Sequence, residues 1–138
     1  MTLLAADSSF LIDLLAGKDE AVSKMREIES ESSSLAVPSV VVYELLVLSG
    51  PERRSKKAQK AVNTVETLVS RIGVVWPLDR AAAKLAADIQ RNSFSKGRPL
   101  SVRDLFLAAT ALTNGCGTVV TRNERDFSAI EGLRVETY

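Results

Sequence analysis

Short apolar segments alternate with helical segments along this chain, and this alternation restricts the fold more than any other feature. Each apolar run is brief and is bounded by turn-forming or helix-capping residues, which is typical of a buried strand. The predicted strands are Leu3–Ala6, Leu35–Val37, Gly73–Trp76 and Thr118–Thr121, with Leu133–Glu136 as a fifth strand at an edge. Strands separated by helices form parallel sheets covered on both faces. The sequence therefore predicts an α/β fold, a three-layer α/β/α sandwich with a mainly parallel sheet of four to five strands.

The segments between these strands carry apolar residues at helical spacing. The predicted helices are Phe10–Ala16, Glu20–Glu31, Pro38 to about Ser49, Arg53–Ile72, Asp79 to about Asn92, and Val102–Asn114. We expect a loop over Ser93–Ser101 and a polar turn over Arg122–Ser128. A length of 138 residues is close to the commonest domain size, so residues 1–138 are predicted to form one domain.

The composition excludes several kinds of active site. The chain has no histidine, which rules out Ser-His-Asp and Cys-His triads and histidine-ligated metal sites. Cys116 is the only cysteine, so the chain contains no internal disulfide. Lysine and arginine total 18 against 17 acids, and this net charge of +1 gives no argument for nucleic-acid binding. Neither a signal peptide nor a membrane span is recognisable, so we expect a cytoplasmic protein without membrane contact.

Four acids fall at informative positions. Asp7 follows the first strand and Asp126 follows the fourth, at the sheet edge where parallel sheets bind ligands, although a helix cap and a turn residue are the simpler roles. Glu44 lies within Val40–Leu48, a segment apolar nearly all round and hence expected to be buried. A carboxylate there requires either a salt bridge or a bound cation. Asp104 begins a helix, where it also compensates the helix dipole.

The order of these elements and acids resembles that of the PIN-domain nucleases, in particular the VapC-type toxins of prokaryotic toxin–antitoxin pairs. Four blocks carry the resemblance, and together they span nearly the whole chain. They are Asp7–Asp13, Tyr43-Glu44-Leu45, Gly97–Asp104 running into Leu107–Ala111, and Val120–Phe127. A single Asp-x-Ser motif is weak, whereas four blocks in this order at these distances are specific.

The resemblance implies an acidic pocket that holds Mg²⁺ or Mn²⁺. Its ligands would be Asp7, Glu44, Asp104 and Asp126, and we favour Asp126 over the neighbouring Glu124 for the fourth position. The resemblance also makes Thr121 and Asn123 polar neighbours of these ligands, and makes Ser9 a residue that orients Asp7 or a bound water. Asp13 fits the family pattern, but it lies almost two helical turns beyond Asp7, and we expect a structural role for it.

Metal-activated water suits a site without histidine. Two carboxylates about 4 Å apart repel by roughly 4 kcal/mol at an effective dielectric of about 20, so four converging acids require a cation. Oxygen ligands select hard ions such as Mg²⁺ and Mn²⁺, which lower the pKa of a bound water and neutralise a phosphate.

An RNA substrate also requires cations near the acids. The residues Lys96, Arg98 and Arg103 flank Asp104 and are candidate phosphate contacts. Arg122 is expected either to pair with an acid or to contact phosphate. The basic start of the long helix is expected to be a solvated face; it comprises Arg53, Arg54, Lys56, Lys57 and Lys60.

The leading prediction is therefore a metal-dependent endoribonuclease toxin that acts on RNA. The resemblance implies a VapB-like antitoxin, which would insert a basic residue among the acids and lay a helix in an apolar groove. Val40–Leu48 and the first helices are candidate surfaces, and a homodimer is expected because many relatives form one.

Two alternatives stay open: a PIN-domain ribonuclease of RNA processing without an antitoxin, and a catalytically silent α/β interaction module. A nucleotide-binding module is disfavoured because no glycine-rich loop follows the first strand. A phosphatase with an Asp-x-Asp nucleophile is disfavoured because Ser9 occupies the second position.

Overall fold

A computed structural model describes residues 2–48, 55–97 and 100–138 and contains a five-stranded parallel sheet. The strands are β1 (Leu3–Ala6), β2 (Ser34–Pro38), β3 (Val75–Trp76), β4 (Thr118–Val120) and β5 (Arg134–Glu136). They lie in the order β3-β2-β1-β4-β5, and all four neighbouring pairs run parallel. The predicted α/β class and parallel sheet are therefore confirmed, and Leu133–Glu136 is the edge strand that the sequence indicates.

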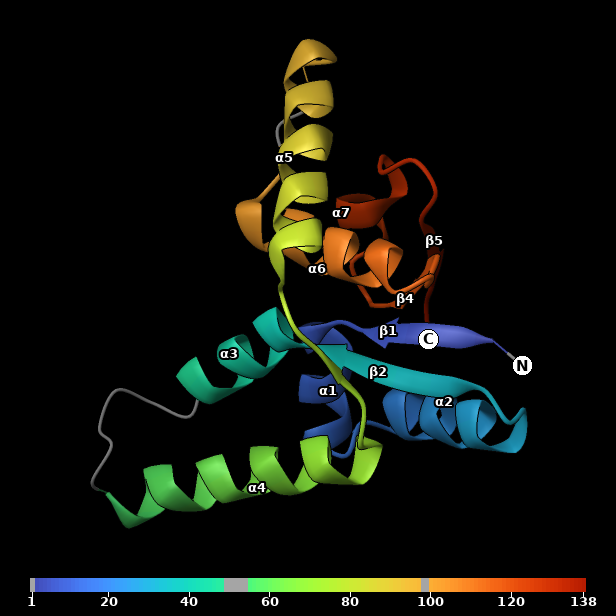
Figure 1. The fold of residues 1–138 in the computed structure, drawn as a ribbon. Coiled ribbons are helices and arrows are strands. Elements are labelled where there is room, and N and C mark those ends of the chain that lie inside the picture. Colours follow the sequence, from blue (N-terminus) through green and yellow to red (C-terminus); the bar gives the residue numbers. More distant parts are fainter. Residues whose placement is uncertain (1, 49–54, 98–99) are drawn as a thin grey trace.

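Helices cover both faces of this sheet. They are α1 (Ser8–Leu15), α2 (Asp19–Ser30), α3 (Ser39–Val47), α4 (Lys56–Ile72), α5 (Arg80–Ser95), α6 (Val102–Thr113) and α7 (Glu124–Ser128). Helices α1, α2 and α4 lie on one side of β1 and β2, whereas α5, α6 and α7 lie on the other side (Figure 1). This arrangement gives the three layers of an α/β/α sandwich.

The core forms where the central strands meet the helices. Leu4, Val37 and Val119 on three neighbouring strands are almost fully buried, as are Phe10 on α1 and Leu107 on α6. Apolar side chains point to both faces of the sheet, which is why the strands appear in the sequence as continuous apolar runs.

The strand order places a topological switch between β1 and β4. From β1 the chain continues to β2 and then β3 on one side, whereas β4 and β5 are added on the other side of β1. Ala6 of β1 pairs with Val120 of β4, and the backbone N–H of Asp7 donates to the carbonyl of Val120 at 3.0 Å. The residues that follow these two strands therefore emerge side by side, at the position where open α/β sheets bind ligands.

Several local predictions differ from the structure. Helix α5 continues through Ser95, three residues into the loop predicted from Ser93. Pro38 ends β2 with an extended backbone and precedes α3, rather than forming its first turn. This position suits proline, because its fixed φ is compatible with a strand end and with the residue before a helix. The predicted polar turn over Arg122–Ser128 contains the short helix α7, whose first turn carries Glu124 and Asp126. Acids in a first turn stabilise a helix through its dipole.

Helix α3 is less buried than its sequence indicates. Val41 and Leu45 are buried, but Tyr43, Val47 and Leu48 are 66%, 56% and 66% exposed. The expectation of a helix buried on all sides is therefore wrong, because α3 packs against α1, α4 and α6 and leaves one apolar face uncovered. Within the described residues, no helix is both long and apolar enough to cross a membrane.

Candidate active site

Asp7 lies at the switch point, between the end of β1 and the start of α1. It caps α1, since its Oδ1 accepts a hydrogen bond from the backbone N–H of Ser8 at 2.8 Å. Its Oδ2 accepts from the hydroxyls of Thr121 at 2.6 Å and Ser9 at 3.1 Å. The side chain is fully buried, so these donors replace the water that would otherwise solvate the carboxylate.

Arg103 joins three of the predicted metal ligands. Its Nη1 lies 3.1 Å from Asp7 Oδ1 and 2.8 Å from Glu44 Oε1, and donates a hydrogen bond to each. Its Nη2 lies 3.0 Å from Asp104 Oδ1. The structure therefore brings Asp7, Glu44 and Asp104 together around one guanidinium. We call these three acids and Arg103 the Arg103 cluster.

Three helices position the Arg103 cluster. Glu44 lies in the second half of α3 and is half-buried, so it reaches the cluster from the rim rather than from the core. Asp104 lies in the first turn of α6, where the hydroxyl of Ser101 caps the helix by accepting from the backbone N–H of Asp104 at 3.1 Å. This cap fixes the first turn of α6, and with it the positions of both Arg103 and Asp104.

Burial and mutual repulsion favour the neutral forms of two of these acids. Burial raises the pKa of Asp104, and the neighbouring charges of Asp126 and Asp7 raise it further, against the opposing effect of Arg103. Burial is also the main reason why the pKa of Glu44 is raised, and Arg103 opposes this shift as well. Acids that resist ionisation together are typical of a site that accepts a further cation.

Asp126 lies near the cluster but outside it. It is exposed on α7 and is close enough to Asp104 for its charge to raise the pKa of that carboxyl. Glu124 is also exposed on α7. Asn123, between Thr121 and α7, donates its backbone N–H to Thr121 Oγ1 at 3.0 Å.

Arg122 belongs to a second group of contacts. It donates to both oxygens of Asp13, at 2.9 and 3.1 Å, and the hydroxyl of Tyr138 donates to the same carboxylate at 2.7 Å. The hydrogen bond from Tyr138 is the largest cause of a lowered pKa at Asp13, ahead of the contributions of Lys18 and Arg122. These contacts tie the end of the chain to α1, in agreement with the structural role predicted for Asp13.

The other predicted cations are not part of the Arg103 cluster. Lys56, Lys57 and Lys60 are exposed at the start of α4, as expected of a solvated face, and Lys96 is exposed at the end of α5. Arg53, Arg54 and Arg98 lie outside the described residues. Arg103, predicted as a phosphate contact, is paired with acids instead.

The bridging role of Arg103 was not predicted from the sequence. A cation in the first turn of a helix is opposed by the helix dipole. The position of Arg103 in the first turn, next to Asp104, therefore indicates that nearby acids stabilise its charge.

The donor set suits Mg²⁺ or Mn²⁺, although the acids are not arranged as a finished metal site. Carboxylate oxygens are the ligands that these ions prefer. Asp104 Oδ1 is buried and has no aligned hydrogen bond within the described part of the chain. Over residues 2–48, 55–97 and 100–138, no three acids are placed to hold an ion together. The guanidinium of Arg103 lies in contact with each of the three acids that would do so.

Comparison with known proteins identifies the family. The family model described as "PIN domain" matches residues 5–133. The "tRNA(fMet)-specific endonuclease VapC" of Shigella flexneri is 30% identical over 121 residues, covering 88% of each chain. The protein of the same name from Salmonella typhimurium is 28% identical over 132 residues, covering 96% of this chain and 95% of that one.

Solved structures show the same fold. DNA-bound VapBC from Salmonella typhimurium superposes with a TM-score of 0.82 at 26% identity, covering 99% of this chain and 98% of that one. VapBC2 from Rickettsia felis, bound to a promoter DNA fragment, gives a TM-score of 0.84 at 18% identity and covers 99% of both chains. The chain therefore belongs to the PIN-domain family, and within that family it is of the VapC type.

Proposed function

We propose that this protein is a Mg²⁺- or Mn²⁺-dependent endoribonuclease and the toxin of a VapBC-type toxin–antitoxin pair. One observation carries the proposal: Asp7, Glu44 and Asp104 converge within 3.1 Å of a single guanidinium at the switch point of a PIN fold. The relatives named as endonucleases match along 88% and 96% of this chain, so the resemblance covers the site together with the fold around it.

The proposed ligands are Asp7, Glu44, Asp104 and Asp126. Ser8, Ser9 and Thr121 fix the direction of the Asp7 carboxylate, and the capped first turn of α6 fixes Asp104. Asp126 would complete the site from its exposed position on α7. A divalent ion held by these oxygens would supply a water nucleophile near neutral pH and would neutralise charge on the phosphate. This chemistry needs no histidine.

The substrate that we propose is RNA. The curated relatives are named as tRNA(fMet)-specific endonucleases, and this printed name supports an RNA substrate for a chain of the same family. We propose Lys96, which is exposed at the end of α5, as a contact for RNA phosphates; Arg98, predicted for the same role, lies outside the described residues. An RNA substrate and a VapB-like antitoxin partner fit the cytoplasmic location that we propose for this protein.

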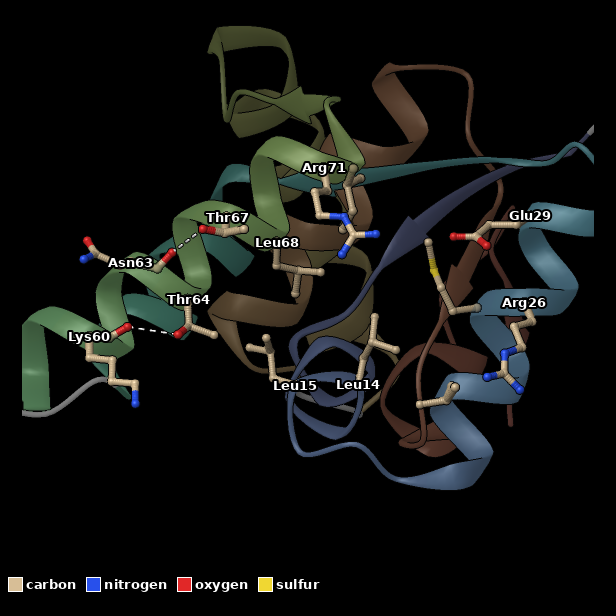
Figure 2. Close-up of a pocket in the computed structure, with 13 residues that line it drawn as sticks. Leu14, Leu15, Arg26, Glu29, Lys60, Asn63, Thr64, Thr67, Leu68 and Arg71 are labelled. Carbon is tan, nitrogen blue, oxygen red and sulfur yellow. Dashed lines mark hydrogen bonds between the residues drawn. The ribbon is translucent and has the colours of Figure 1, made fainter.

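A groove between helices α1, α2 and α4 is the surface that we propose for an antitoxin helix. It measures about 720 Å³. Leu14, Leu15 and Leu68 form part of its apolar floor, and Figure 2 shows them extending toward one another from α1 and α4. Three cations and one acid line it as well: Arg26, Lys60, Arg71 and Glu29. We propose that an amphipathic antitoxin segment with acidic residues binds here, since apolar anchors and opposite charges recognise such helices.

The uncovered face of α3 supports a homodimer. Tyr43, Val47 and Leu48 are each more than half exposed, and adjacent exposed apolar side chains are typical of an interaction surface. We propose that this face packs against a second copy of the chain.

Cleavage of RNA by the purified protein tests the proposed activity. We expect single-stranded RNA to be cut in Mg²⁺ or Mn²⁺ and to stay intact in EDTA, and sequencing of the cut ends would identify the preferred site. Growth arrest that is relieved by the neighbouring antitoxin gene distinguishes a toxin from an RNA-processing enzyme. Intact RNA under all metal conditions would favour the silent interaction module.

A further inference from the structure

Arg103 contacts every acid of its cluster at once. Its two terminal nitrogens lie 3.1, 2.8 and 3.0 Å from oxygens of Asp7, Glu44 and Asp104. Three ionised carboxylates and one guanidinium leave a formal charge of −2 in the cluster. One divalent cation would neutralise the charge that remains.

The guanidinium uses the oxygens that a metal would need. Each oxygen of Asp7 accepts two hydrogen bonds: Oδ2 from Ser9 and Thr121, and Oδ1 from Ser8 and Arg103. Departure of the Arg103 guanidinium would leave Oδ1 with one donor and room for a metal. Glu44 presents Oε1 to Arg103 in the same way. A metal bound to these oxygens would stand within a few ångströms of the arginine charge, and the two cations would repel strongly.

The side chain of Arg103 has access to solvent. It is the second residue of α6, and its side chain is 30% exposed, whereas Asp7 is fully buried behind it. The guanidinium therefore lies on the solvent side of the buried carboxylate. Its contact with Asp104 Oδ1 has the distance of an ion pair without an aligned hydrogen bond, so this contact is the weakest of the three.

We propose that Arg103 is an internal counterion, which holds the three acids together in the metal-free protein and competes with the divalent metal for them. The proposal rests on the metal site of the proposed function and deepens it. Metal binding then requires the guanidinium to move into solvent, where it becomes free for another anion. Arg103 is therefore a positioning residue, and it raises the concentration of metal at which the site becomes occupied.

Measurement of Mn²⁺ affinity by isothermal titration calorimetry tests the proposal. We expect Arg103→Gln to bind Mn²⁺ about tenfold more tightly than the unmodified protein, a difference of about 1.4 kcal/mol. Arg103→Lys keeps the charge but not the planar fork, so its affinity should fall between the two. Arg91→Gln is the matched control. Arg91 pairs with Asp88 on the surface of α5, and its substitution removes the same charge from the protein as Arg103→Gln does. Its affinity should remain unchanged.

Thermal unfolding in EDTA provides a second measurement. In EDTA, Arg103→Gln has no cation among the acids and should melt at a lower temperature than the unmodified protein. Saturating Mn²⁺ should raise the melting temperature of Arg103→Gln by more than it raises that of the unmodified protein. A merely structural arginine would lower stability without tightening metal binding. Unchanged or weaker Mn²⁺ affinity in Arg103→Gln, while the unmodified protein still cleaves RNA with metal, would overturn the counterion proposal alone. Absence of Mn²⁺ binding in both proteins would overturn the proposed metal site as well.

Discussion

Removal of the Thr121 hydroxyl tests how the structure holds Asp7. Thr121 follows β4 and donates to Asp7 Oδ2 at 2.6 Å, the shortest of the contacts to this fully buried carboxylate. The same hydroxyl accepts from the backbone N–H of Asn123 at 3.0 Å. The Thr121 hydroxyl also lies at hydrogen-bond distance, 3.1 Å, from the Ser9 hydroxyl. Thr121→Val keeps the shape of the side chain and removes all three contacts. Thr121→Ser is the matched control, because it keeps the hydroxyl and loses a methyl group.

The size of the effect follows from the charge of the acceptor. A hydrogen bond to an ionised group contributes about 1.5–3 kcal/mol, more than a bond between neutral groups. Asp7 retains Ser8, Ser9 and Arg103 as partners, so we expect a decrease of about 2 kcal/mol in the free energy of unfolding. This corresponds to a melting temperature lower by roughly 6–10 °C. A carboxylate held in a less well defined direction should also slow RNA cleavage, by about tenfold.

Urea denaturation and single-turnover RNA cleavage measure these two effects. We expect Thr121→Ser to stay within about 1 kcal/mol of the unmodified protein and to retain most of its activity, whereas Thr121→Val loses both stability and rate. Equal stability and equal rates for the valine and serine variants would refute the reasoning, because the hydroxyl would then contribute nothing at Asp7.

Three further predictions concern surfaces and the end of the chain. Folding lowers the pKa of Asp13, chiefly through Tyr138, so this stabilisation is present above about pH 4 and lost as pH falls through the lower folded value. Tyr138→Phe should therefore be less stable at pH 7, with a difference that shrinks in acid, as urea denaturation would show. Leu15→Asp introduces a charge into the groove and should abolish antitoxin binding in a pull-down assay while leaving the homodimer intact. Val47→Asp on the exposed face of α3 should disrupt the homodimer, so that light scattering gives the mass of a monomer, while the variant still binds the antitoxin in the pull-down assay.

Most of the fold is predictable because the strands are buried on both faces. Such strands appear as uninterrupted apolar runs, and Leu3–Ala6 is found where the sequence places it. The exposure of α3 is not predictable in the same way. The sequence shows that apolar residues, among them Tyr43, Val47 and Leu48, occur nearly all round this helix. Only the packing of α1, α4 and α6 determines which side of the helix stays uncovered.

The candidate site is predictable to a smaller extent. Asp7 can be placed at the switch point from its position after the first strand, and the hydroxyls of Ser9 and Thr121 are found beside it. The contacts of Arg103 depend on the direction of a long, flexible side chain among acids that are distant in sequence, since Glu44 lies 59 residues away. Sequence spacing does not determine the direction of such a side chain. The sequence alone therefore does not distinguish between two roles of Arg103, as a phosphate contact and as a partner of acids.

The most direct test of the central claim is RNA cleavage by Asp104→Asn. Asparagine keeps the size of the side chain and removes the charge of a buried proposed metal ligand, so the variant should fold and lose nearly all Mn²⁺-dependent cleavage. Asp88→Asn, which removes an exposed acid from the surface of α5, should cleave at the unmodified rate. Full metal-dependent cleavage by a folded Asp104→Asn protein would contradict the assignment of the active site to these carboxylates.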